Sequence, residues 1–302
     1  MSKQFRITHA LAVSAMALTF SVSAQAGASR TFVSTTGSDS NTSVNCSPST
    51  PCRTFAAAIS VTNSGGEVVV LTSGGYGPAT ISQPVIITAI GIDASISVTT
   101  SGGAGLTVNT PGNVTLIGLN LHGEGTGLDG ILVQQVGFLR LYNMLIENIT
   151  NNGVDFGGGG GKLAIYGSKI NDNGNAGLFV ANTSDSEAAY VQGSSFDHNL
   201  YGVNVFFGSA TVTDSSAEYS GSIGFNVDTG ILVLFNDAAI FNHTGLASNA
   251  ASELYFANCL ISNNATAYSA QSGGVMAGTN PGTSFIAPGQ TTSGSLSTIA
   301  LQ

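Results

Sequence analysis

The sequence contains no tryptophan and carries little charge, since only 8% of its 302 residues are Asp, Glu, Lys or Arg. Basic residues are the scarcest, with 7 Lys and Arg against 16 Asp and Glu. Nucleic acid binding needs clustered Lys and Arg, so we expect no nucleic acid partner. We also expect anionic polysaccharides to be repelled unless a bound cation bridges them, whereas neutral glycans remain possible ligands.

Long apolar runs are scarce as well. The stretch from Leu11 to Val22 is well short of the roughly 20 residues that span a bilayer. It follows Lys3 and Arg6 and precedes the tripeptide Ala-Gln-Ala at 24–26, an arrangement typical of a secretory signal peptide. We therefore expect cleavage near Ala26, no membrane span, and a secreted protein that is extracellular or periplasmic, with its oligomeric state left open.

Cysteine is limited to three residues. Cys46 and Cys52 lie six apart in a proline-flanked loop, a spacing compatible with a disulfide in an exported protein. Cys259 has no evident partner, and we expect a small packed residue there rather than a reactive thiol.

A repeat of 21 to 26 residues runs through the middle of the chain. In each of seven units an apolar residue is followed by a second one two places on and by a third at the seventh place. The first members are Val114, Leu139, Leu163, Ala189, Ala210, Val233 and Leu254, and in the sixth unit the other two are Phe235 and Ile240. A fixed period of this length predicts a solenoid, whose units bury their apolar faces by stacking on one another.

Apolar residues two places apart lie on one face of a strand, so each unit is expected to consist of strands. The fourth place of the units holds only Gly, Asn and Asp, which adopt the left-handed backbone conformation at least cost: Gly118, Asn143, Gly167, Gly193, Asp214, Asp237 and Asn258. This column predicts a sharp bend between two strands. The pattern favours an all-β, right-handed parallel β-helix of about ten coils over a leucine-rich repeat or a β-sandwich.

The predicted domains follow from the repeat. After the signal peptide at 1–26, residues 27–66 form an N-terminal cap with a strand, the disulfide loop and a short capping helix at 54–62. Residues 67–272 form the β-helix, and residues 273–302 form a C-terminal cap or tail.

The opening of the mature chain resembles a known family. Residues 31–41, 51–55, 66–70 and 75–76 look like the start of bacterial secreted proteins of the pectin-lyase-like superfamily. The resemblance implies the β-helix fold but not one activity, because the superfamily includes lyases, hydrolases, epimerases and binding proteins. Of the motifs typical of polygalacturonases, only Asn-x-Asp is present here, at Asn226-Val227-Asp228. The tryptophan-containing segment of pectate lyases is missing, because the sequence has no tryptophan.

Polar residues that follow the third apolar column are the candidates for chemistry. Asp197, His198 and Glu218 should lie on neighbouring coils, at separations that glycoside hydrolysis uses, and are the predicted catalytic residues. Asp172, Asp197 and Glu218 are the predicted ligands of a possible Ca²⁺ ion. The simpler interpretation of these carboxylates is a solvated face.

Tyrosines outside the core columns are the candidates for glycan binding, because sugar rings stack on aromatic faces. They are Tyr142, Tyr166, Tyr190 and Tyr219, of which the first two should stack one coil apart.

Three functions stay open. The first is a secreted β-helix that binds extracellular or cell-surface polysaccharide without catalysis. The second is a polysaccharide lyase or glycoside hydrolase that acts from Asp197 and Glu218, and the third is a structural or adhesion protein of the cell surface.

Overall fold

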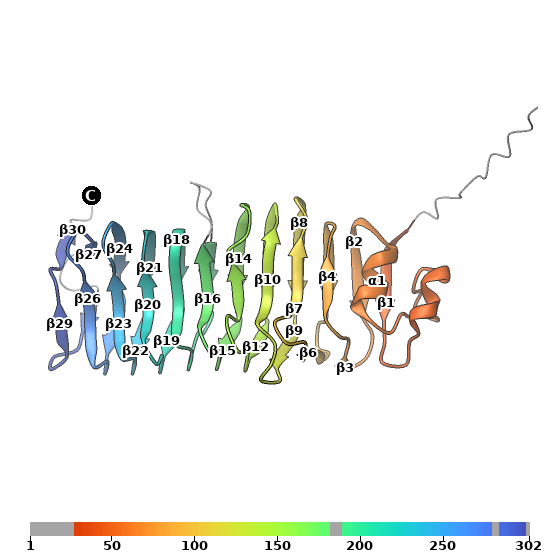
Figure 1. The fold of residues 1–302 in the computed structure, drawn as a ribbon, viewed down its shortest axis with the longest axis horizontal. Coiled ribbons are helices and arrows are strands. Elements are labelled where there is room, and N and C mark those ends of the chain that lie inside the picture. Colours follow the sequence, from red (N-terminus) through yellow and green to blue (C-terminus); the bar gives the residue numbers. More distant parts are fainter. Residues whose placement is uncertain (1–26, 182–188, 280–283, 300–302) are drawn as a thin grey trace, which may run out of the picture.

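The computed structural model describes residues 27–181, 189–279 and 284–299. The chain winds into an elongated right-handed parallel β-helix of about nine turns (Figure 1). Every strand pairing between coils is parallel, and each coil contributes to three sheets. The predicted fold class is confirmed. The predicted signal peptide lies outside the described residues.

Sheet 1 runs the whole length of the described chain, with its strands in parallel pairs from coil to coil. Its strands are β1 (Ala28–Val33), β2 (Thr62–Val70), β5 (Val85–Thr88), β8 (Asn113–Ile117), β11 (Phe138–Tyr142), β14 (Lys162–Tyr166), β17 (Ala189–Gln192), the end of β18 (Tyr201–Thr213), β21 (Gly230–Phe235), β24 (Ser252–Ala257), β27 (Val275–Thr279) and β30 (Ser297–Ile299).

Sheet 2 follows sheet 1 within each coil, after the sharp bend. Its strands are β3 (Gly74–Gly75), β6 (Ala94–Val98), β9 (Leu119–Gly123), β12 (Leu145–Glu147), β15 (Lys169–Asn171), β19 (Ser216–Glu218), β22 (Ala238–Ile240), β25 (Leu260–Ser262) and β28 (Phe285–Ile286). Bridges through Ser195 connect β15 to β19.

Sheet 3 completes the coil. Its strands are β4 (Ala79–Ile81), β7 (Ala104–Asn109), β10 (Asp129–Gln135), β13 (Val154–Phe156), β16 (Ala176–Ala181), the start of β18, β20 (Ile223–Val227), β23 (Thr244–Ser248), β26 (Thr266–Ala270) and β29 (Thr291–Ser293). The strand ladder therefore continues past residue 272 into the segment predicted as a cap or tail.

The N-terminal end is covered by the short helix α1 (Phe55–Val61), as predicted. The Thr54 hydroxyl accepts a hydrogen bond from the Ala57 N–H and caps the helix. Phe55 and Ile59 are buried against the first coils. The 3₁₀ helix η1 (Asp39–Val44) precedes the confirmed disulfide between Cys46 and Cys52.

The core columns stack in the predicted register. Leu139 pairs with Leu163, which pairs with Ala189, and all three are buried. At the corner between sheets 2 and 3, asparagine side chains form an internal ladder in which Asn173, Asn242 and Asn264 each accept a backbone N–H from the preceding coil. Buried amides are stable there because their polar atoms are paired.

One coil was predicted one residue out of frame. Leu232 and Leu234 of β21 pair with the core columns, while Val233 and Phe235 point outward. The third column likewise passes through Ala239 rather than Ile240, and Asn236 rather than Asp237 has the left-handed backbone. The error arose because residues 231–235 are all apolar, so that the alternation that sets the face of a strand is missing.

In the described part of the chain, no helix has the length and apolar character needed to cross a membrane.

The corrected frame predicts unequal costs for two neighbouring truncations. Leu232→Ala should lower the free energy of unfolding by about 2–5 kcal/mol, because it leaves a cavity in the core. Val233→Ala should cost less than about 1 kcal/mol, because its side chain is partly in solvent. Urea unfolding of both variants measures the difference, and equal costs would contradict the register.

Candidate functional site

The outer face of sheet 1 carries three of the four predicted glycan-binding tyrosines. Tyr142 and Tyr166 occupy the same place on β11 and β14, and their rings stack 4.9 Å apart at 11°. Tyr190 on β17 pairs with Ala164, so its ring leans onto Tyr166 with centroids 5.9 Å apart. We call this surface, together with Phe138, Arg140 and Lys162, the tyrosine face.

The tyrosine face is also rich in basic residues. The Arg140 guanidinium lies 3.7 Å from the centroid of the Phe138 ring, a cation–π contact that holds the side chain in place. Lys162 is exposed and lines a hollow of about 270 Å³ with Tyr166 and Tyr190. Lys169 lies on β15 of sheet 2, past the bend of the same coil, so three of the five Lys and Arg outside the predicted signal peptide lie on two successive coils.

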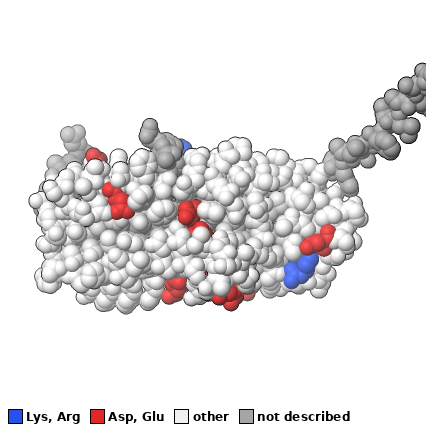
Figure 2. All heavy atoms as spheres, viewed as in Figure 1, with Lys and Arg blue, Asp and Glu red and all other residues white. Residues whose placement is uncertain are grey.

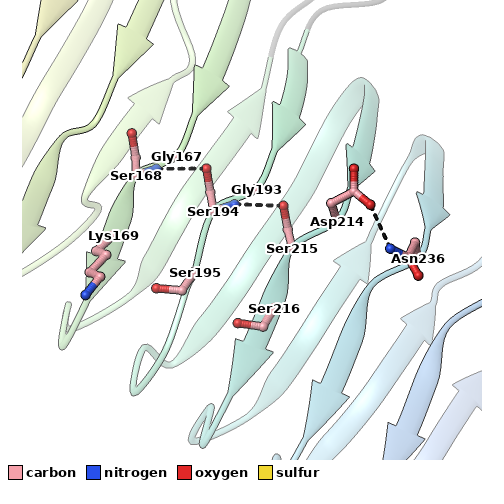
Figure 3. A pocket seen from close by; sticks show the side chains of 10 residues that line it. All are labelled: Gly167, Ser168, Lys169, Gly193, Ser194, Ser195, Asp214, Ser215, Ser216 and Asn236. Atoms are coloured by element: carbon pink, nitrogen blue, oxygen red, sulfur yellow. Dashed lines mark hydrogen bonds between the residues drawn. The ribbon is translucent and has the colours of Figure 1, made fainter.

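Beside the tyrosine face, where sheet 1 bends into sheet 2, a groove of about 410 Å³ is lined by residues of four successive coils (Figure 3). Gly167 and Gly193 have left-handed backbones, and their missing side chains leave the groove open. Lys169 lies along one side, and Asp214, hydrogen bonded to Asn236, lies at the far end. We call it the bend groove, and the sequence did not reveal it because no single residue marks it.

A ladder of buried hydroxyls forms the floor of the bend groove. Ser168 and Ser194 donate their backbone N–H to the Oγ of Ser194 and Ser215 on the following coils (Figure 3). Asp237 continues the ladder, because its Oδ1 accepts from the Ser215 N–H and its Oδ2 from the Phe235 N–H. The corrected frame aligns Asp237, rather than Ala238, with Cys259 on the next coil.

Burial raises the pKa of Asp237 to about 7. The two hydrogen bonds that its carboxylate accepts from backbone N–H groups lower the pKa, but by less than burial raises it. Burial also raises the pKa of the Cys259 thiol to about 11, and the thiol donates to the Ala257 carbonyl. A thiol with so high a pKa is scarcely ionised at neutral pH, in line with the predicted packing role.

The predicted catalytic residues lie at a different corner, between sheets 2 and 3. Asp197 Oδ1 accepts the backbone N–H of Glu218 at 3.2 Å, which places the two carboxylates on successive coils. Burial raises the pKa of both, and the Asp197 charge adds to the rise at Glu218. The neighbouring imidazole of His198 opposes the rise in pKa at both carboxyls.

Tyr219, the fourth predicted glycan-binding residue, lies at this second corner and not on the tyrosine face. Its ring stacks between His198 at 4.9 Å and Phe241 at 5.0 Å. We call these three residues the ring stack. Asp172 has the same left-handed corner position one coil before His198.

The predicted calcium ligands do not form a compact set. Among the residues that the structure describes, no group of three or more His, Cys, Asp or Glu side chains could hold a metal ion. The view in Figure 2 likewise shows acidic side chains as separate spots on a largely uncharged face. The calcium site therefore stays a prediction from the sequence.

A further polar cluster was missed by the sequence analysis. Asp129 is buried, and its Oδ1 accepts from the Asn151 amide and the Asn152 N–H. Asn152 in turn donates to Asp155 on β13. Burial raises the pKa of both carboxyls, and Asp155 adds to the rise at Asp129. The only sequence signal was the outward place of Asp155 between the core residues Val154 and Phe156.

The stacked coils, with their three parallel sheets, define the chain as a parallel β-helix protein. A family model described as "Right handed beta helix region" matches residues 56–217, and the chain belongs to that family. No curated protein matches the sequence significantly.

Two solved structures share the fold. One is an alginate lyase from Paenibacillus sp. str. FPU-7, with a TM-score of 0.59 and 15% identity, covering 89% of this chain and 100% of that one. The other is the pectate lyase Pel9A, with a TM-score of 0.50 and 16% identity, covering 90% of this chain and 77% of that one. At these identities the likeness concerns the fold.

The raised pKa of Asp237 predicts that stability falls as pH rises. The folded state holds a proton up to about pH 7, whereas the unfolded state releases it near the ordinary aspartate pKa of 3.8, so the contribution of Asp237 to stability is greatest below pH 3.8. The loss amounts to at most about 4 kcal/mol by pH 7. Asp237→Asn should flatten the dependence, measured by urea unfolding across this range, and an unchanged slope would contradict the assignment.

Proposed function

We propose that the protein binds an acidic polysaccharide along the tyrosine face and the bend groove. The observation that carries this proposal is the placement of Arg140 and Lys162 among three tyrosines, with Lys169 at the adjoining bend groove. The chain that follows the predicted signal peptide is acidic as a whole, with a formal charge of −11 from five Lys and Arg and sixteen Asp and Glu. The two similar structures are named as lyases of pectate and of alginate, both acidic polymers, which supports the same class of ligand here.

The net charge of the chain led us to expect that anionic polysaccharides are repelled, but the local charge of the tyrosine face is positive. Screening limits electrostatic interactions in solution to about 8–10 Å, so a ligand on the tyrosine face interacts mainly with the nearby cations and little with distant carboxylates. Arg140, fixed over Phe138, presents a guanidinium that can pair with a carboxylate through two hydrogen bonds. Lys162 and Lys169 supply further charges along the same coil.

The shape of the surface suits a chain that lies along the solenoid axis. Tyr142 and Tyr166 repeat at 4.9 Å, and their half-buried rings are held in place by the strands that carry them. Rigid side chains lose little conformational entropy when a ligand binds. The open bend groove, with Asp214 and Asn236 at its far end, offers hydrogen-bond partners for sugar hydroxyls.

Loss of the two cations should weaken binding. In the variant Arg140→Ala/Lys162→Ala we expect the Kd for an oligogalacturonate to rise at least about tenfold, and the salt dependence of binding to decrease. Isothermal titration calorimetry at two salt concentrations measures both quantities.

Arg30→Ala is the control for loss of a positive charge elsewhere, because it removes one cation from the N-terminal strand β1, where Arg30 pairs with Glu67. It should leave the Kd unchanged. Equal Kd values for the double variant and the wild type would contradict the proposal.

Cleavage from the second corner is the second candidate function. It is favoured by the raised pKa values of Asp197 and Glu218 on successive coils, with His198 beside them. If the protein is a lyase or hydrolase, incubation with polysaccharide should release unsaturated or reducing ends, and Asp197→Asn should abolish the release. Product formation that persists at full rate in this variant would exclude Asp197 as a catalytic residue.

A further inference from the structure

The ring stack is an exposed aromatic surface that the function proposed above does not use. His198, Tyr219 and Phe241 follow one another on three successive coils, with interplanar angles of 14° and 9°. Tyr219 and Phe241 are each 47% exposed, and His198 is exposed as well. The stack lies at the corner between sheets 2 and 3, whereas the tyrosine face lies on sheet 1.

The fold does not require rings at these positions. All three residues have left-handed backbones, with φ of 56°, 54° and 58°. Other coils place asparagine at the same corner, as at Asn148 and Asn263, which is the cheaper choice. A left-handed residue with a bulky side chain costs about 1–2 kcal/mol, and each ring contact returns only about 0.5–1.5 kcal/mol. The rings therefore bring no clear gain in stability.

The surroundings of the ring stack are negative. Asp197 and Glu218 immediately precede His198 and Tyr219 on the outer face of sheet 2, and Asp172 lies one coil before His198. Within the described ranges none of these three carboxylates forms a salt bridge with Lys or Arg. In the described part of the chain, the corner thus combines an apolar strip with carboxylates that form no salt bridge with Lys or Arg.

We infer that the ring stack binds a polysaccharide that carries protonated amino groups, such as a deacetylated hexosamine polymer. Ammonium groups pair with carboxylates through charge-assisted hydrogen bonds. The repeat of a pyranose chain is close to the strand spacing of about 4.8 Å, so one sugar can face each coil. An extended peptide presents side chains on one face about every 6.6 Å and does not match the coils.

This site is separate from the proposed acidic-polysaccharide site and has the opposite charge preference. The two sites lie on different sides of the solenoid, since β11, β14 and β17 of sheet 1 carry the tyrosine face, whereas the ring stack follows sheet 2 at the ends of β19 and β22. Both together would allow one molecule to join an acidic and a basic polymer.

The test uses a glucosamine hexamer as probe, with its fully N-acetylated form as the matched ligand, at a pH at which the amine is protonated. Wild-type protein should bind the amine form and bind the acetylated form at least about tenfold more weakly. The variant Tyr219→Asn/Phe241→Asn should weaken binding of the amine form at least about tenfold. Its melting temperature should be equal or higher, because asparagine suits the corner.

Glu218→Gln tests the charge independently of the rings and should also weaken binding of the amine form. The inference is overturned if the ring variant binds like the wild type, if the acetylated hexamer binds equally well, or if a lysine hexapeptide competes as strongly as the amine sugar. Release of shorter sugars from the bound hexamer would also overturn it, in favour of catalysis. Arg140→Ala/Lys162→Ala should leave this binding unchanged, so failure of the acidic site is distinguishable.

Discussion

Backbone hydrogen bonding between successive coils is the constraint on which the rest of the structure depends. Each coil must return to the same height with its strands in register, because its apolar side chains are buried only between two neighbours. Leu139, Leu163 and Ala189 show the result, with three side chains from separate coils in one buried column.

The same register organises the surface. Side chains that alternate with the core residues point outward on every coil. Outward positions of successive coils lie next to one another, so residues of one type at these positions form a stripe along the solenoid. On sheet 1 the stripe holds tyrosines with arginine and lysine, and at the corner between sheets 2 and 3 it holds carboxylates and aromatic rings. One solenoid thereby carries surfaces of opposite charge on different sides.

The bends impose a second constraint, since a chain that turns sharply inside the wall must satisfy its buried polar groups. Serine hydroxyls do so below the bend groove and asparagine amides do so at the next corner. Asp237 performs the serine's role with a carboxyl, whose burial raises its pKa to about 7. A neutral ladder residue at this position would remove that dependence on protonation, so the carboxyl is a local departure from the pattern of its neighbours.

The sequence by itself determined the fold class, the bend column, the capping helix and the stacking of Tyr142 on Tyr166, because period and residue type are local properties that every coil repeats. It failed at Val233 and Phe235, where an all-apolar strand carries no alternation, and there pairing with the neighbouring coils decided the face. Only the tertiary structure showed that Tyr219 stacks between His198 and Phe241, and that a groove opens at the bend between sheets 1 and 2. The reason is physical, since which columns share a surface depends on the angle at each bend, and that angle is set by packing among coils.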